Sequence, residues 1–339
     1  MSHRPAIVVT SISGPNESLQ ALAAGAESRG FQFIVVGDTT SPADFNLRGC
    51  DFYDLARQEE SNFHYAKLCP TGSYARKNIG YLLAIAAGAP QIFETDDDNI
   101  PRDAFWNARE LTVQARRVAS AGWVNVYRYF TDASIWPRGF PLDAVQTLPP
   151  AFDALPVSFA ECPIQQGLAD GDPDVDAIYR LILPLPQNFC SDRSVILGAG
   201  SWCPFNSQNT TWWPQAYPLM YLPAHCSFRM TDIWRSFVAQ RIAWANGWSI
   251  LFHEPTVWQE RNEHNLLRDF ADEVPGYLNN RAIGAALTDL QLAPGAAHAG
   301  ANLRLCYETL VSGGWVGEPE LELVDAWIAD LALIQDRAR

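Results

Sequence analysis

The sequence predicts an α/β protein with a mixed sheet flanked by helices and a site where strands end. Ala6–Thr10 and Phe33–Gly37 are short apolar runs rich in β-branched residues, as buried strands are. Between them, residues 16–29 carry leucines and alanines at helical spacing, and Gly30 ends the pattern. This β-α-β opening implies a parallel sheet with sites at the carboxyl ends of its strands. From Leu266 onward the pattern is helical, so we expect a helical C-terminal extension.

The stretch Gln91–Asn99 is the strongest candidate for that site. An apolar, β-prone run ends there in Glu94, Asp96, Asp97 and Asp98. Carboxylates this dense repel one another unless a cation or water separates them. Mg²⁺ and Mn²⁺ bind one or two carboxylates together with substrate phosphates. The pattern therefore predicts a metal site for a nucleotide diphosphate.

The spacing of the aspartates gives the predicted metal site a geometry. If the extended conformation continues past the strand, Asp96 and Asp98 point to one side and Asp97 to the other. We expect Asp96 and Asp98 to bind the metal, and Asp96 and Asp97 to contact the nucleotide. For an isolated D-x-D, a solvated acidic turn or an Asx-turn is the better interpretation, because so short a motif matches by chance.

Composition limits the classes of partner. The chain of 339 residues is 48% hydrophobic and 18% charged, with a net charge of −14. Nucleic acids and anionic membranes favour basic patches, so neither is an expected partner. The sequence shows no signal-peptide pattern and no run of about eighteen apolar residues. We expect a cytoplasmic protein without an integral membrane segment.

Arg76 and Lys77 are candidates for phosphate contacts. They lie in the first turns of a helix that Ser73 caps, where cations oppose the helix dipole. A bound phosphate explains them, and a solvated basic face explains them equally well. This helix leads directly into the acidic stretch, so we expect its N-terminus at the opposite end of the sheet, with Lys77 reaching across.

Two residues that follow predicted strands are further candidates. Ser11 begins the turn after the first strand, and Asp38 ends the second. We expect both to contact the nucleotide, with Asp38 suited to a base or ribose. A plain cap of the turn into Thr39–Pro42 explains Asp38 equally well.

The middle of the chain is predicted to alternate helices, strands and loops. A helix begins at Pro101–Trp106 and continues through residues 107–120, and strands are expected over Val124–Phe130, Ala177–Leu183 and Trp248–Phe252.

Aromatic residues are dense in residues 200–224 and suit the wall of a sugar-binding cleft, because sugar rings stack on aromatic faces. Packing beneath a long loop explains each one at least as well. They are Trp202, Trp212, Trp213, Tyr217 and Tyr221.

The next helix and the polar cluster at residues 259–264 hold three more candidates. Asp232 lies in the first turn of the helix from Thr231 to Asn246, where an acidic residue is favoured without catalysis. In the polar cluster, His264 suits a metal ligand or a phosphate contact and Arg261 a phosphate contact, although a lone histidine is more often structural.

Several motifs resemble the STELLO family of glycosyltransferase-like proteins in the same order along the chain. They are DFNLRGCDFYDL (44–55), PTGSYARKNIGYLLAIAAGAPQIFETDDD (70–98), SIWPRGFPLD (134–143), IQQGLADGDPDVDAIY (164–179) and residues 232–244. The resemblance extends from about Ile7 to Val257. Plant members are Golgi proteins with a membrane anchor, and we expect a bacterial-type member without one.

The resemblance implies a glycosyltransferase-A fold, in which a D-x-D at a strand end holds a divalent metal under a sugar nucleotide. The family pattern D-x-D-D places its acidic positions on Glu94, Asp96 and Asp97, so Asp96 is common to both alignments. By position, the resemblance implies Asp232 as the catalytic base. It implies either His264 or His253 as the ligand that completes the metal site.

The function expected from these features is metal-dependent transfer of a sugar, hexosyl or pentosyl, to an acceptor hydroxyl on a glycan or another acceptor. The donor is a nucleoside diphosphate sugar, expected to be UDP-linked, and the cofactor is Mn²⁺ or Mg²⁺. Residues 1–100 are expected to bind the donor and 101–264 the acceptor, with 265–339 as the helical extension. Alternatives are a sugar-nucleotide mutase, a phosphatase of the haloacid-dehalogenase type and a non-catalytic scaffold.

Overall fold

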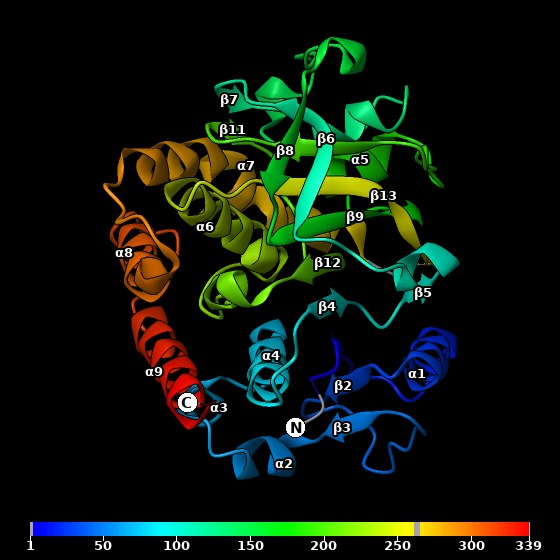
Figure 1. Ribbon diagram of the computed structural model, residues 1–339, viewed down its shortest axis with the longest axis vertical. Coiled ribbons are helices and arrows are strands. Elements are labelled where there is room, and N and C mark those ends of the chain that lie inside the picture. The colour runs from blue at the N-terminus through cyan, green and yellow to red at the C-terminus, as the bar shows by residue number, and fades with distance from the viewer. Residues whose placement is uncertain (1–2, 261–264, 339) are drawn as a thin grey trace.

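A computed structural model describes residues 3–260 and 265–338, and a mixed β-sheet runs through its centre (Figure 1). The strand order is β3-β2-β1-β4-β12-β9-β13-β10-β6-β8, and β5 pairs with the end of β13. The strands are β1 (Ala6–Thr10), β2 (Gln32–Val36), β3 (Asp51–Tyr53), β4 (Ile92–Thr95), β5 (Asn99–Pro101), β6 (Thr112–Val118), β8 (Val157–Glu161), β9 (Ile164–Gly171), β10 (Ser194–Leu197), β12 (Asn209–Trp212) and β13 (Ile250–Gln259). A separate pair joins β7 (Gly122–Trp123) to β11 (Ser201–Trp202).

The first four strands confirm the predicted β-α-β opening. Strands β3, β2, β1 and β4 are parallel, so their carboxyl ends meet at one edge of the sheet. Helix α1 (Glu17–Arg29) connects β1 to β2; the Asn16 side chain accepts from the backbone N–H of Leu19, and Gly30 ends the helix in the left-handed region. On the other side of β4, β12 is antiparallel, so the sheet is mixed at this point.

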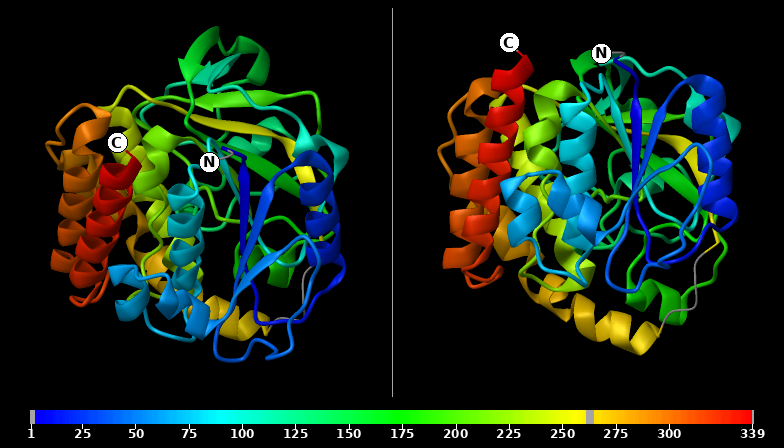
Figure 2. Two further views of the ribbon diagram at one scale, coloured as in Figure 1. Left: turned by 60° about the horizontal axis from the view of Figure 1, so that its bottom comes forward. Right: turned by 90° about the horizontal axis from the view of Figure 1, so that it is seen from below.

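Helices cover both faces of the sheet (Figures 1 and 2). Helix α1 lies on one face, where Ile7, Val9 and Phe33 pack against it, and α4 (Lys77–Ala86) lies on the other, against Val8 and Ile34. The face with α4 also carries α6 (Thr231–Ala245), α8 (Ala299–Ser312) and α9 (Glu320–Ala338). The remaining helices are α2 (Leu55–Glu60), α3 (His64–Leu68), α5 (Ala177–Ile182) and α7 (Leu266–Asp289). The mixed α/β class and the C-terminal helices are as predicted.

Glycine makes the close packing of α4 on the sheet possible. A Cβ atom built on Gly80 would lie 2.5 Å from Cγ1 of Val8 and 2.8 Å from Cγ2 of Val36. The helix therefore lies nearer to β1 and β2 than a side chain at this position would allow. Among the described residues, none of the helices combines the length and apolar composition that a bilayer crossing requires.

Several local predictions in the middle of the chain are wrong. Residues 107–120 contain strand β6, which pairs with both β8 and β10, and only a 3-10 turn precedes it at Asp103–Trp106. Pairing on both sides outweighs the weak helical propensity of this segment. A 3-10 turn at Val126–Tyr129 takes the place of the strand expected over Val124–Phe130.

Residues 177–182 are helix α5 where a strand was expected. The side chain of Asp176 accepts a hydrogen bond from the backbone N–H of Tyr179 at 2.7 Å and so caps the helix. Strand β13 is longer than predicted and runs through His253 to Gln259.

Candidate functional site

A cavity of about 660 Å³ lies where β1, β2 and β4 end. The loop before α4 and the start of α6 close it on other sides. Its lining includes seven of the residues predicted for the site, namely Ser11, Asp38, Arg76, Asp96, Asp97, Asp98 and Asp232. Arg261 and His264 lie outside the described residues. The cavity thus brings together residues that are up to 221 positions apart in the sequence (Ser11 to Asp232).

The three aspartates after β4 lie in a turn. Strand β4 ends at Thr95, and the backbone N–H of Asn99 donates to the carbonyl of Asp96 at 3.3 Å. Because the extended conformation stops here, the expected alternation of side chains does not hold. All three carboxylates line the cavity.

Each of these carboxylates has its own hydrogen-bond partner. Asp97 Oδ2 accepts from the hydroxyl of Ser11 at 2.6 Å, and Asp98 Oδ2 accepts from Nε2 of Gln259 at 2.9 Å. Burial raises the pKa of the Asp97 carboxyl; the hydrogen bond from Ser11 opposes this rise, and the negative charge of Asp96 adds to it. The turn is thus tied to the ends of both β1 and β13.

Asp96 is paired with Lys77. The Lys77 ammonium lies 3.0 Å from Asp96 Oδ1, which also accepts from the Tyr74 hydroxyl at 2.7 Å. The expectation that Lys77 reaches across the sheet is wrong, because α4 runs antiparallel to the strand that follows it. The N-terminus of α4 therefore lies at the edge where β4 ends. The Lys77 side chain is fully buried behind Asp96 and is not part of the cavity lining.

Glu94, one of the acidic positions in the alternative alignment, faces away from the cavity. Its carboxylate lies 2.8 Å from Nη1 of Arg235 and accepts from Nε1 of Trp212 at 2.8 Å and from the hydroxyl of Tyr81. The side chain is fully buried and the cavity lining does not include it. The structure therefore places Glu94 in the core between β4 and α6.

Arg76 and Asp38 organise the loop before α4. The Arg76 guanidinium donates to Oε1 of Gln58 and to the carbonyl of Cys69. Asp38 accepts from the backbone N–H of Thr39 at 2.7 Å and of Ser73 at 3.1 Å. In this structure both side chains hold the backbone that forms the cavity wall.

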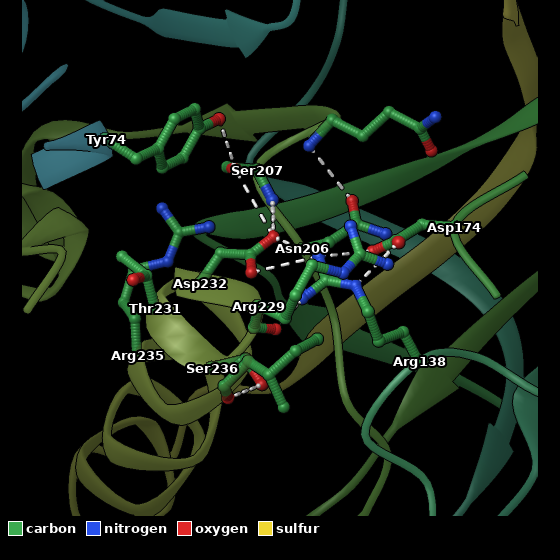
Figure 3. A network of polar contacts seen from close by, with 12 residues as sticks. Tyr74, Arg138, Asp174, Asn206, Ser207, Arg229, Thr231, Asp232, Arg235 and Ser236 are labelled. Atoms are coloured by element: carbon green, nitrogen blue, oxygen red, sulfur yellow. Dashed lines mark hydrogen bonds and ion pairs between the residues drawn. The ribbon is translucent and has the colours of Figure 1, made fainter. Parts of the chain in front are cut away.

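Asp232 lies at the start of α6 and is tied to Arg138 (Figure 3). Nη2 of Arg138 lies 3.0 and 2.9 Å from the two oxygens of Asp232, and the same guanidinium pairs with Asp174 at 2.8 and 2.9 Å. Burial alone would lower the pKa of Arg138, but the charges of Asp174 and Asp232 hold it well above its ordinary value. One buried cation thus holds two carboxylates at the cavity wall.

Two hydroxyl groups connect Asp232 to the acidic turn, and Figure 3 shows both of them, those of Ser207 and Tyr74, beside Asp232. The hydroxyl of Ser207 lies 3.3 Å from Asp232 Oδ2 and 2.7 Å from the hydroxyl of Tyr74, which in turn donates to Asp96. The sequence reasoning missed Tyr74, Arg138, Asp174 and Ser207 as members of the site. Tyr74, Arg138 and Asp174 lie within the motifs that resemble the STELLO family, and this position in the motifs could have indicated that they belong to the site.

The other predicted ligands lie elsewhere. His253 is buried on β13, outside the cavity lining; burial first, and then the charge of Arg109, lower its pKa well below the ordinary value. None of the five aromatic residues expected as a cleft wall lines the cavity, and all are buried, so the packing alternative describes them. Within residues 3–260 and 265–338, no three or more His, Cys, Asp or Glu side chains are grouped to hold a metal ion.

Fold and cavity together define an α/β protein with an acidic cleft at the carboxyl ends of its strands. Comparisons with known proteins show a similarity to one family. Residues 229–336 match the profile described as "STELLO glycosyltransferases". Two Arabidopsis thaliana proteins, "Probable glycosyltransferase STELLO2" and "Probable glycosyltransferase STELLO1", are 29% and 27% identical to this chain over 349 aligned residues. The alignment takes in 97% of this chain and 44% of each relative.

The predicted resemblance is confirmed as a similarity to the STELLO glycosyltransferases. It spans less than half the length of the two curated relatives. A solved structure titled "Crystal Structure of a Mycobacterial Protein" aligns with 92% of this chain and 74% of its own, at 10% identity and a TM-score of 0.40.

Proposed function

We propose that this protein is a metal-dependent glycosyltransferase that moves a sugar from a UDP-linked donor to a hydroxyl of an acceptor such as a glycan. The observation that carries the proposal is one cavity lined by Asp96, Asp97 and Asp98 and also by Asp232. Similarity to two probable glycosyltransferases supports the class of reaction.

The cavity divides into two parts that correspond to the proposed roles of the chain. Residues from the ends of β1 and β2 and from the loop before α4, including Ser11, Asp38 and Ser73, form the part proposed for the nucleotide. Arg138, Asp174 and Asp232 come from beyond residue 100 and form the part proposed for the sugar and the acceptor. This arrangement is the one expected of a glycosyltransferase-A fold.

The acidic turn is the proposed position of Mn²⁺ or Mg²⁺. Asp96 and Asp98, with His264 as the third proposed ligand, would hold the cation, and Asp97 lies next to them. A small number of carboxylate ligands suits a cation that also takes phosphate oxygens and water. When bound, such a cation neutralises charge that develops on the leaving diphosphate.

Asp232 is the proposed proton acceptor. Its Oδ2 accepts hydrogen bonds from Arg138 and from the backbone N–H and the hydroxyl of Ser207. Among the described residues, its Oδ1 accepts a hydrogen bond from Arg138 alone. Oδ1 is therefore the atom to which an acceptor hydroxyl would donate. Arg138, which also lines the cavity, fixes the orientation of this carboxylate, as a positioned proton acceptor requires.

A binding experiment tests the donor site before any acceptor is known. Wild-type protein should be stabilised in a thermal-shift assay by UDP with Mn²⁺ more than by either alone, since a ligand that binds the folded state raises its stability. Asp96→Ala should remove the joint effect. An equal thermal shift for the variant, or an unchanged affinity in titration calorimetry, would exclude the assignment.

Product analysis separates the alternatives. A mutase converts its sugar nucleotide without added acceptor, and a phosphatase of the haloacid-dehalogenase type forms an aspartyl-phosphate on Asp96. A scaffold binds a partner and shows no turnover with any donor that stabilises it.

A further inference from the structure

Lys77 carries a buried positive charge next to the acidic turn. Its side chain has no exposed surface, whereas 29% of the Asp96 side chain is exposed. The ammonium donates to the carbonyl of Thr95 at 2.7 Å, to the hydroxyl of Tyr74 at 2.8 Å and to Asp96 Oδ1 at 3.0 Å. These three acceptors match its three N–H groups, and the carbonyl of Ser207 lies farther away, at 3.4 Å. Lys77 is therefore fixed behind Asp96 and does not reach a ligand in the cavity.

A fixed charge at this place changes what the acidic turn binds. A free divalent cation near Asp96 meets a carboxylate that Lys77 already partly neutralises, and the ammonium repels it. A nucleotide diphosphate brings negative charge and oxygen ligands that offset this repulsion. The cation alone is thus disfavoured in comparison with the cation together with the diphosphate.

We propose that Lys77 is an internal counter-ion of Asp96 and makes cation binding depend on the nucleotide diphosphate, so that the cation enters with the nucleotide and not before it. This inference rests on the proposed function, because it takes Asp96 as a cation ligand. Lys77 is a positioning residue in this scheme, since it touches neither the cation nor the diphosphate.

Calorimetric titration of Mn²⁺, with and without UDP, tests the inference. Wild-type protein should bind Mn²⁺ weakly alone and more tightly with UDP. Lys77→Met should tighten the binding of Mn²⁺ alone by about tenfold or more, because the full charge of Asp96 becomes available. The effect of UDP on Mn²⁺ affinity should shrink accordingly. The matched control is Lys67→Met, because Lys67 and Lys77 are the two lysines of the chain and Lys67 lies in α3, outside the cavity lining.

Tyr74→Phe separates the charge from the hydrogen bond. It removes a neutral donor from the same oxygen of Asp96 and should change the Mn²⁺ affinity much less than Lys77→Met does. If Lys77→Met unfolds the protein, as circular dichroism would show, Lys77→Gln gives the same test with a neutral side chain that still donates.

The outcomes separate this inference from the proposed function. Equal affinities of wild type and Lys77→Met for Mn²⁺ alone overturn the counter-ion, even where UDP and Mn²⁺ bind together. If the variant gains Mn²⁺ binding but neither protein binds UDP, the counter-ion is supported and the proposed function fails.

Discussion

Glu94 and Arg235 form a buried ion pair, with 2.8 Å between Oε2 and Nη1, two residues before the acidic turn. Both side chains are about 99% buried or more, and the guanidinium also lies 5.0 Å from the ring centroid of Trp212. This pair joins β4 to α6, and therefore joins the strand that leads into Asp96 to the helix that contains Asp232 in its first turn.

Breaking this pair should destabilise the protein strongly. Arg235→Met or Glu94→Gln alone should lower the free energy of unfolding by about 3–5 kcal/mol, because a buried group is left without its partner. The double variant should lose less than the sum of the two. Urea unfolding measures this, with the partly exposed pair Arg304 and Glu308 as control, where about 0–1 kcal/mol is expected. Additive losses at Glu94 and Arg235 would contradict the coupling.

Asp232→Asn should lower the rate of sugar transfer by about a hundredfold or more, because the amide cannot accept a proton. Binding of UDP with Mn²⁺ should not change, since the acidic turn is intact. Steady-state kinetics and calorimetry check the two halves of this prediction. Asp143→Asn, which removes an exposed carboxylate paired with Arg281, is the control. Loss of UDP binding with unchanged turnover would argue against a proton acceptor at this position.

Asp176 should make stability depend on pH. Burial raises the pKa of its carboxyl from 3.8 to about 6. Hydrogen bonds from the Tyr179 N–H and the Trp136 indole act in the opposite direction and lower this pKa. A raised pKa favours the protonated folded state, so this contribution is complete below pH 3.8 and is lost as the pH rises through about 6. Asp176→Asn should flatten the fall in unfolding free energy between about pH 4 and 7. Asp54→Asn, at the cap of α2, is the matched control in urea unfolding, and equal slopes for the two variants would refute the assignment.

Asp330→Ala should loosen α3 from α9. The two oxygens of Asp330 accept from the backbone N–H groups of His64 and Tyr65 at 2.9 and 2.8 Å, in the manner of a helix cap supplied from another helix. The expected loss is about 1–2 kcal/mol of unfolding free energy. Asp325→Ala, an exposed position in the same helix, should cost less. Similar losses for both would mean that the cap contributes nothing.

Some features of the fold could be predicted from the sequence because their cause is local. The segment of α1 contains its own capping residues and a helical spacing of apolar residues. The acidic turn is recognisable by its three consecutive aspartates. The segment at residues 107–120 lacks such a cause, since it becomes β6 by pairing with strands that follow it in the chain. Helix α5 has a local cause, the cap that Asp176 supplies, but the strand prediction for residues 177–183 did not take that cap into account.

The candidate site was less predictable than the fold. Glu94 and Asp96 are two positions apart in the sequence. Only the structure shows that β4 ends between them, so that Glu94 lies in the core and Asp96 lines the cavity. Arg138 lies in an irregular segment, and nothing local indicates that it holds Asp232, which follows it by 94 residues. A helix that connects parallel strands runs antiparallel to them, and this rule explains why Lys77 lies beside Asp96. The prediction that Lys77 reaches across the sheet did not apply the rule correctly.

Helix α9 has a consequence for the order in which the protein takes shape during synthesis. The carboxylate of Asp330 accepts hydrogen bonds from the backbone N–H groups at the start of α3. The carboxylate of Glu320 accepts hydrogen bonds from the backbone N–H groups of Ala224 and His225. One of these contacts lies upstream of the loop that ends in Ser73, and the other upstream of α6. A nascent chain on the ribosome can complete its first strands early. The two walls of the cleft therefore acquire the support of α9 only after that helix has emerged.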